Sequence, residues 1–236
     1  MCGRYALYAA GERIARQFRL EAVPGLDARY NLAPGQSLAV VTEGRGHDRQ
    51  LRFMRWGLVP GWSKTPSVPY STINARAETV AEKPVFRSAF RRRRCLIPAS
   101  GWYEWQPAAG GRQPWFMHPR RGQGLLAFGG VWEHWAGDGA EPFDSVAIVV
   151  TAAAPSLQPI HDRMPVLIEA PDYEAWLDHE NHDSARLQAL MQSADAAGVQ
   201  ALRVSTHVNS PKHDDPRCIE PFDAGDRRPA QIDTDG

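Results

Sequence analysis

The second residue of the chain is a cysteine, and its position gives it two reactive groups at once. An initiator methionine is normally removed when the next residue is small, so we expect Cys2 to become the first residue of the mature chain. A free N-terminal cysteine carries an amine with a pKa near ~8 beside a thiol with a pKa near ~8.5. With an aldehyde, such an aminothiol forms an imine and then a five-membered thiazolidine ring. Position alone favours the alternative, an incidental cysteine at a frayed terminus.

Polar side chains in the segment 71–79, STINARAET, are suited to holding a sugar and a phosphate. Asn74 both donates and accepts hydrogen bonds, and Arg76 can bind a phosphate through two parallel hydrogen bonds. Arg4 can also meet a phosphate, and its charge would lower the pKa values of the nearby N-terminal groups. The alternatives are that Asn74 is a turn residue and that Arg76 pairs with Glu78.

The stretch PASGWYEW places a carboxylate among aromatic side chains. Strand alternation would put Trp102 and Glu104 on one face, and Tyr103 and Trp105 on the other. A partly desolvated Glu104 would have a raised pKa and would exchange protons near neutral pH. Trp105 is a candidate for stacking on an unpaired base, although most tryptophans in such a domain are core residues. The alternative for Glu104 is a salt bridge to an arginine at 91–94.

His161 is the candidate catalytic histidine among the eight in the chain. It lies in IHDRMPVLI, directly before an apolar segment that is predicted to be a strand. Charged residues at the start of a strand are held on a rigid edge, which suits a proton-transfer group. A lone histidine is more often structural, and that alternative stays open.

The candidate DNA contacts are Arg4, Arg76, Trp105 and Arg163.

The sequence predicts neither a metal site nor a cofactor. His207, His213 and Cys218 lie close together in the sequence, but their spacing matches no usual zinc pattern. The three cysteines form no CxxC pair and leave an odd thiol. They therefore indicate a reducing compartment rather than a disulfide framework.

Charge is distributed unevenly along a chain whose formal net charge is zero. Residues 1–106 contain 17 Lys and Arg against 8 Asp and Glu, whereas residues 107–236 contain 10 against 19. Such asymmetry favours a nucleic-acid partner, because phosphate attraction depends on a local basic surface rather than on the total charge. The arginine run at 91–94 is most simply a solvated basic face, with phosphate contact as the second interpretation.

Short apolar segments separated by Gly and Pro are typical of a β-rich domain, and helical periodicity is confined to a few stretches. Asp183 is the expected N-cap of the last helix. The mixture predicts an α+β fold with a curved, barrel-like, mainly antiparallel β-sheet core and a few peripheral helices. The expected strands are 38–42, 51–58, 95–105, 113–117, 125–133, 145–152, 164–168 and 202–206, and the expected helices are 12–20, 84–91, 172–178 and 183–194.

With 236 residues and 43% hydrophobic content, the chain can bury one sizeable core. We expect a single domain over 2–222 and a polar, disordered tail over 223–236. The sequence has no run of 18 apolar residues and no apolar signal segment. These features predict a cytoplasmic, nucleoid-associated monomer.

Several ordered motifs together resemble the SRAP family, the SOS-response-associated peptidase-like proteins that shield abasic sites. The resemblance covers roughly residues 2–222, and it is far more specific than any single motif. It implies a single α+β domain with a barrel-like β core. The motifs are CGRY at 2–5, RYNLAPGQ at 29–36, MRWGLVPGW at 54–62, INARAET at 73–79, RRCLIPASGWYEW at 93–105, FGGVWE at 128–133 and IHDRMPVLI at 160–168.

The resemblance also implies a thiazolidine cross-link between the N-terminal cysteine and the ring-opened abasic sugar of single-stranded DNA. A missing base needs no readout, so no sequence specificity is expected. No metal, organic cofactor or named replication partner is implied. The implied roles are nucleophile for Cys2, active-site polar groups for Asn74 and Glu104, acid–base histidine for His161, and phosphate contacts for Arg4 and Arg76.

Two other functions compete with this interpretation. A cysteine peptidase would use Cys2 as nucleophile and His161 as base, with self-removal of Met1 as its minimal activity, and would need an oxyanion hole. A plain single-strand-binding module would bind DNA in a salt-sensitive way and would be indifferent to an abasic lesion.

Overall fold

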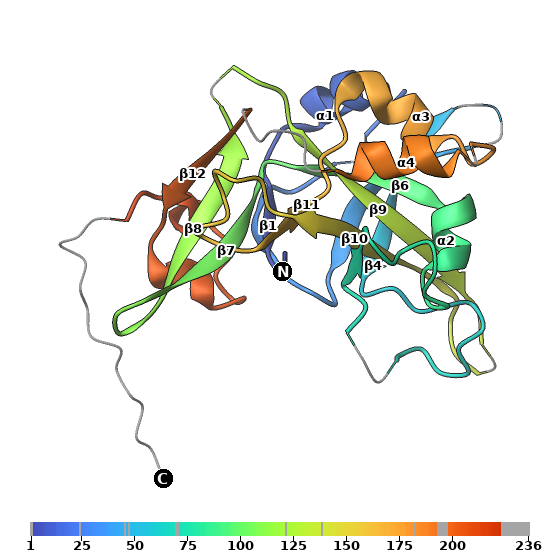
Figure 1. Cartoon of the computed structure of the whole chain (residues 1–236), viewed down its shortest axis with the longest axis horizontal. Coiled ribbons are helices and arrows are strands. Elements are labelled where there is room, and N and C mark those ends of the chain that lie inside the picture. Colours follow the sequence, from blue (N-terminus) through green and yellow to red (C-terminus); the bar gives the residue numbers. More distant parts are fainter. Residues whose placement is uncertain are drawn as a thin grey trace, which may run out of the picture.

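The computed structural model describes residues 2–23, 25–44, 46, 48–68, 71–120, 122–137, 139–181, 183–192 and 198–222. Within them, two β-sheets lie side by side and helices flank them (Figure 1). The predicted α+β class, with mainly antiparallel sheets and few helices, is confirmed. The predicted tail at 223–236 lies outside the described residues.

The smaller sheet anchors the N-terminal segment. Its order is β12–β8–β7–β1–β2, and all its pairings are antiparallel. β1 lies between β7 and β2, so the backbone directly after Cys2 is held from both sides. The strands are β1 (Tyr5–Leu7), β2 (Arg29–Leu32), β7 (Gly101–Ala108), β8 (Gly111–Pro119) and β12 (Val199–Arg203).

The larger sheet has the order β11–β10–β4–β3–β6–β9, and β9 also pairs with β10. The strands from β10 to β9 therefore close into a ring, which is how the expected curvature is realised. β4 and β5 both pair with β10 in parallel. The strands are β3 (Ser37–Glu43), β4 (Arg49–Trp56), β5 (Asn74–Arg76), β6 (Arg94–Ala99), β9 (Leu126–Trp135), β10 (Phe143–Ala152) and β11 (Arg163–Pro165).

The helices are short and peripheral. In α1, Ile14 and Phe18 are buried as their spacing predicts, and the Asp183 side chain caps α4 by accepting two backbone amides. No described helix has the length and apolar character needed to cross a membrane. The helices are α1 (Gly11–Phe18), α2 (Arg87–Arg92), α3 (Tyr173–Leu177) and α4 (Ser184–Met191), with 3-10 turns at Ala170–Asp172, Thr206–Asn209 and Pro216–Ile219.

The strand predicted over 95–105 is two strands in different sheets. β6 pairs with β9 in the ring, whereas β7 pairs with β1 and β8. At Gly101, where the chain changes sheet, an added Cβ would lie 2.4 Å from the Met117 carbonyl oxygen and 2.4 Å from the Phe116 ring. Glycine permits this close approach. Local strand propensity carries no sign of the change of partner.

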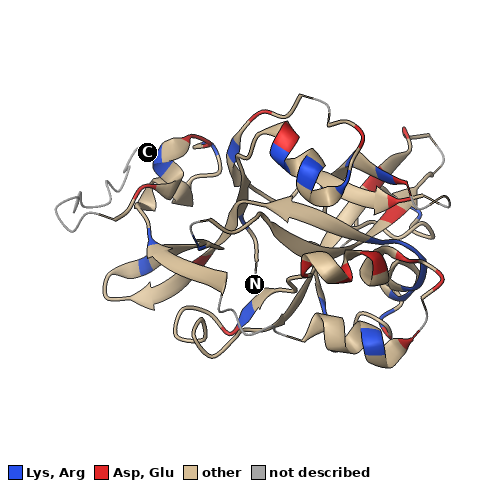
Figure 2. Cartoon of the chain, turned by 90° about the horizontal axis from the view of Figure 1, so that it is seen from above, with Lys and Arg blue, Asp and Glu red and all other residues tan. Residues whose placement is uncertain are grey.

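The charge asymmetry of the sequence does not produce two oppositely charged lobes. β10, from the acidic half of the chain, pairs with β4 and β5 from the basic half. β9 likewise pairs with β6. In Figure 2, Lys and Arg positions are accordingly interspersed with Asp and Glu positions. A basic surface must therefore be identified locally, from side chains that lie together in space.

The last arginine of the run at 91–94 is a core residue. Arg94 is 3% exposed, and its guanidinium donates to main-chain carbonyl oxygens of α2, α3 and the turn after α3. Burial lowers the pKa of Arg94 to about 10, so the side chain stays charged at neutral pH. The expectation of a solvated basic face is therefore wrong for this arginine. The acceptors are the carbonyl oxygens of Phe90, Arg91, Trp176, Asp178 and Asn181.

We expect Arg94→Met to lower the free energy of unfolding by roughly 3 kcal/mol, because several buried carbonyl oxygens lose their donor. Urea denaturation monitored by tryptophan fluorescence measures the loss. The matched control is Arg91→Met, on the exposed side of the same segment, which is expected to change stability by less than about 0.5 kcal/mol. Equal effects of the two substitutions would contradict the structural role of Arg94.

Candidate active site

Cys2 is held at the junction of the two sheets. Its side chain is fully buried, and the residue lies three positions before the start of β1. The Asn74 side chain donates from Nδ2 to the Cys2 carbonyl oxygen at 2.8 Å. Asn74 begins β5, where its backbone is aligned with Ile148 of β10. Asn74 is thus a strand residue rather than a turn residue, and it ties the N-terminal segment to the larger sheet.

Glu104 is a buried carboxyl group on β7, and it faces His161. Its Oε2 atom lies 3.7 Å from Nε2 of His161. Burial raises the pKa of Glu104 to about 7. Burial also raises the pKa of the Cys2 thiol, and the negative charge of Glu104 adds to that increase. A carboxyl group that exists in both forms near neutral pH, within electrostatic reach of Cys2, is suited to proton transfer.

His161 has partners for both of its protonation states. Its Nδ1 atom lies 3.0 Å from the amide nitrogen of Arg163 and 3.0 Å from the carboxylate of Asp162. The neutral ring accepts the amide hydrogen at Nδ1 and carries its own proton on Nε2, the nitrogen nearer to Glu104. A protonated ring would instead donate to Asp162. Burial lowers the pKa of His161, which favours the neutral ring at neutral pH.

Arg4 and Trp105, two of the predicted DNA contacts, lie together against the C-terminal segment, which we define as residues 205–218. The Arg4 guanidinium donates to Asn31 Oδ1 at 2.9 Å and to the carbonyl oxygens of Val208 and Asn209 at 3.1 and 3.3 Å. It lies 5.9 Å from the centre of the Trp105 ring, whose Nε1 donates to Asn209. The single donor of Trp105 is therefore used within the protein, and so are several of the donors of Arg4.

The other two predicted DNA contacts differ in their surroundings. Arg76 is exposed on β5, two residues after Asn74. Arg163 pairs with Glu78 at 2.5 Å. The ion pair of Glu78 is thus made with Arg163, and not with Arg76 as the sequence alternative proposed. Arg93 pairs with Glu133 and Arg94 binds main-chain carbonyls, so neither serves as the salt-bridge partner that the sequence suggested for Glu104.

A hollow of about 460 Å³ opens beside Asn74 and contains a residue that the sequence interpretation missed. Trp62 is 63% exposed and lines this hollow together with Arg76 and Lys83. An exposed indole is unusual, because so large an apolar surface is normally covered in the core. The available sequence signal was the setting of Trp62 in the polar, Pro- and Gly-rich stretch PGWSK, where a core tryptophan is unexpected.

The sequence profile described as SOS response associated peptidase (SRAP) matches residues 1–211. The chain belongs to the SRAP family. It is 36% identical over 223 residues to abasic site processing protein YoqW of Bacillus subtilis (strain 168), covering 93% of this chain and 99% of that protein. It is 33% identical over 227 residues to abasic site processing protein HMCES of Gallus gallus, covering 83% and 67%.

The SRAP fold itself is shared with solved structures of lower sequence identity. The crystal structure of a protein from Bacteroides thetaiotaomicron matches with a TM-score of 0.81 at 21% identity, covering 94% of this chain and 100% of that one. This likeness concerns the arrangement of the two sheets and does not bear on chemistry.

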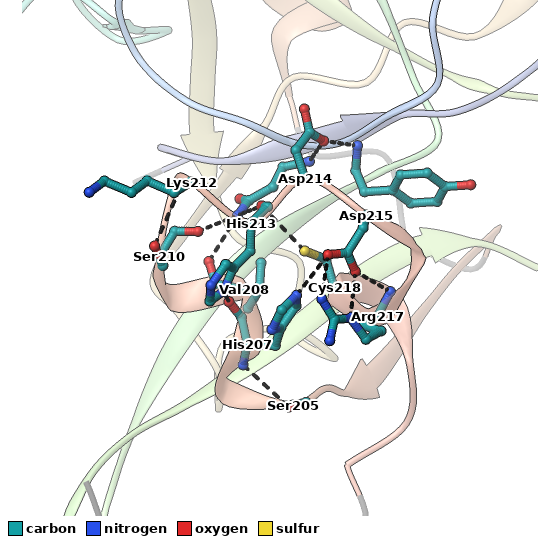
Figure 3. A network of polar contacts seen from close by, with 12 residues as sticks. Ser205, His207, Val208, Ser210, Lys212, His213, Asp214, Asp215, Arg217 and Cys218 are labelled. Carbon is teal, nitrogen blue, oxygen red and sulfur yellow. Dashed lines mark hydrogen bonds and ion pairs between the residues drawn. The ribbon is translucent and has the colours of Figure 1, made fainter. Parts of the chain in front are cut away.

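A network of polar contacts holds the C-terminal segment of this SRAP chain together (Figure 3). His207 Nε2 lies 3.1 Å from the Asp215 carboxylate, which also pairs with Arg217 at 3.0 Å. The ligand atoms of His207, Asp215 and Cys218 lie within 4.8 Å of one another, a spacing that a metal ion could bridge. Asp215 is already bound by two partners, however, and burial raises the pKa of the Cys218 thiol. We therefore interpret the network as structural.

The same segment positions Arg4 through Asn31. The buried Asn31 side chain donates from Nδ2 to the carbonyl oxygens of Val208, Ser210 and His213 at 3.1, 3.0 and 2.7 Å. Its Oδ1 atom accepts from Arg4 at 2.9 Å. Asn31 therefore links β2 and the C-terminal segment to the residue that follows Cys2 by two positions.

Proposed function

We propose that this chain processes abasic sites in single-stranded DNA by forming a covalent bond between the mature N-terminal Cys2 and the aldehyde of the ring-opened sugar. One arrangement of residues from distant parts of the chain carries the proposal: Asn74 is hydrogen-bonded to Cys2, Glu104 is within electrostatic reach of the Cys2 thiol, and His161 faces Glu104. The names of the SRAP relatives, which are abasic site processing proteins, support DNA containing such sites as the substrate.

In the proposed reaction, the Cys2 amine attacks C1′ of the open-chain sugar. The Glu104 carboxylate relays both protons that the amine loses: the first converts the carbonyl oxygen into a hydroxyl group, and the second lets that hydroxyl group leave as water, which produces the imine. The thiol then adds across the C=N bond: sulfur bonds to C1′ and its proton passes to nitrogen. Asn74 orients the N-terminal residue, and His161, with Nε2 toward Glu104, assists the opening of the sugar ring.

The thiol environment favours this order of steps over a peptidase mechanism. A cysteine peptidase requires a thiolate, and hence a lowered thiol pKa. In this chain, burial and the charge of Glu104 both raise the pKa of the Cys2 thiol. A thiol that remains protonated can follow the amine, because it adds to an imine that has already formed. A module that only binds single strands, without covalent chemistry, would not require the polar groups that surround Cys2.

Intact mass spectrometry of the protein mixed with a single strand containing one abasic site tests the proposal. The expected product has the mass of the protein without Met1 plus the DNA minus one water. A strand that carries a tetrahydrofuran in place of the abasic sugar lacks the aldehyde and is expected to give no adduct. Equal adduct formation with Met1 retained would exclude the Cys2 amine as the nucleophile, because that nitrogen would then be part of a peptide bond.

The two predicted phosphate contacts, Arg4 and Arg76, are expected to respond differently to substitution. Arg76→Ala should weaken binding to all single strands alike and should leave stability unchanged, because Arg76 is exposed and phosphate contacts do not read sequence. Arg4→Ala should weaken binding and also lower the free energy of unfolding by about 1–2 kcal/mol, because Asn31 loses a charged donor. Fluorescence anisotropy with several strands and urea denaturation separate the two effects. A loss confined to particular base sequences would contradict the phosphate role.

A further inference from the structure

The arginine run at 91–94 divides into two pairs with opposite surroundings. Arg94 is buried among carbonyl oxygens, and Arg93 is paired with Glu133 at 2.5 Å. Arg91 and Arg92 are exposed at the end of α2. The internal contacts that account for Arg93 and Arg94 therefore do not account for Arg91 and Arg92.

The exposed pair belongs to a basic surface, which we define as Lys83, Arg87, Arg91 and Arg92. All four side chains are exposed. Within the described part of the chain, none of them forms an ion pair with a carboxylate, and Arg92 donates to the Ser88 hydroxyl at 2.8 Å. Glu82 is the acidic neighbour that lines the same region. The basic surface therefore carries a net positive charge that the fold leaves uncompensated.

Three members of the basic surface form a row. The Arg87 amide donates to the Lys83 carbonyl oxygen at 2.8 Å, so the turn before α2 continues into the helix. Lys83, Arg87 and Arg91 are then spaced by four residues, and Arg87 and Arg91, which both belong to α2, are about 6 Å apart along the helix axis. Like charges at this spacing destabilise an isolated helix. A polyanion along the row would remove that repulsion.

The row begins at the candidate active site. Lys83 lines the hollow that contains Asn74 and Arg76. Arg87, Arg91 and Arg92 line a second hollow of about 670 Å³, whose lining residues Glu82 and Arg87 directly flank residues 83–86 of the first hollow. A strand whose abasic nucleotide reaches Cys2 beside Asn74 can therefore continue past Lys83 onto α2.

We infer that the basic surface binds the phosphates of the DNA strand that continues from the abasic nucleotide, and so extends the footprint beyond the reactive site. This inference rests on the proposed function. Phosphate binding there is independent of base sequence, because arginine and lysine side chains contact the backbone and not the base edges. The basic surface thus adds affinity for strands that are long enough to reach it, and it takes no part in the chemistry.

The test compares the triple variant Arg87→Gln, Arg91→Gln, Arg92→Gln with wild type. Binding is measured by fluorescence anisotropy over a series of salt concentrations, using strands with one tetrahydrofuran, which lacks the aldehyde and keeps binding non-covalent. One strand ends close to the lesion, and two others extend it on the 5′ or the 3′ side only. The matched control substitutes three exposed arginines on other elements, Arg16→Gln, Arg120→Gln and Arg186→Gln.

Three lost phosphate contacts should reduce the slope of log K against log salt by about 2, at roughly 0.7 per contact with a single strand. When the salt concentration rises from 50 to 200 mM, the affinity of the triple variant should therefore fall about 16-fold less than the affinity of wild type. We expect the triple variant to show this reduced slope with one of the two extended strands and not with the short strand. The control variant is expected to keep the wild-type slope with every strand. Unchanged slopes with both extended strands would overturn the inference and would favour an acidic protein as the partner of this surface.

The yield of cross-link to a true abasic site in the short strand separates this inference from the proposed function. The triple variant is expected to give the wild-type yield at saturating protein. A wild-type protein that forms no cross-link with any strand would refute the proposed function, whatever the salt slopes show. Thermal unfolding checks that the three substitutions leave the fold intact.

Discussion

Replacing Cys2 with alanine is expected to abolish the stable cross-link to abasic DNA while preserving the first half of the chemistry. Alanine is small, so removal of Met1 is still expected, and an amine remains in place to attack the aldehyde. An imine forms, but no thiol is available to close the ring. Electrophoresis under denaturing conditions should show no spontaneous adduct, whereas borohydride should trap one.

The same substitution is expected to increase strand cleavage. An imine at C1′ acidifies the adjacent C2′ protons, so β-elimination becomes the available exit. The wild-type thiol competes with that exit by converting the imine to a saturated ring. Abasic single strands should therefore be nicked more by Cys2→Ala than by wild type. The matched control is Cys95→Ala, which removes another buried thiol and should retain the cross-link. A stable adduct of Cys2→Ala without reductant would place the nucleophile elsewhere.

Replacing Glu104 with glutamine is expected to slow cross-linking by roughly 10²–10⁴-fold, the range for loss of a general acid–base group. Glutamine keeps the size of the side chain but cannot exchange a proton. Initial binding should remain nearly intact, because Glu104 is buried and not available to phosphates. Single-turnover rates and anisotropy measure the two properties. Glu133→Gln is the matched control, because Glu133 is a buried carboxylate paired with Arg93. Equal losses of rate and affinity in Glu104→Gln would indicate a structural role.

The pH dependence of the rate should change in the same variant. Burial raises the pKa of Glu104 to about 7, so its carboxylate fraction increases as the pH rises through 7. In the proposed reaction, the carboxylate is the form that accepts the proton from the Cys2 amine. The ratio of the wild-type rate to the Glu104→Gln rate is therefore expected to increase by about 10-fold between pH 6 and pH 8. The amine titrates in both proteins and cancels in the ratio. A ratio that stays constant over this range would exclude Glu104 as the base.

Local sequence patterns were sufficient where the relevant interaction is itself local. The alternation in β7 places Trp102 in the main apolar cluster and Tyr103 in the second one, as period-2 geometry requires. The Asp183 cap depends only on the backbone amides two and three positions further along the chain, those of Ala185 and Arg186. Local patterns failed where partners are distant. The change of sheet at Gly101 depends on Met117 and on the Phe116 ring, which no strand propensity reports.

The sequence by itself determined which candidate groups the chain possesses: a cysteine at position 2, for which removal of Met1 is expected, and an asparagine, a carboxyl group and a histidine that were predicted to act with it. Only the tertiary structure decided how these groups are placed and in which direction their pKa values shift, because pKa values depend on burial and neighbours rather than on sequence position. Glu104 acquires its pKa of about 7 by burial, and Asn74 reaches Cys2 across 72 positions. The arginine run illustrates the same limit. Four identical side chains in succession became one core residue, one ion pair and two exposed cations, because helix geometry and packing, which the run does not encode, set the direction of each one.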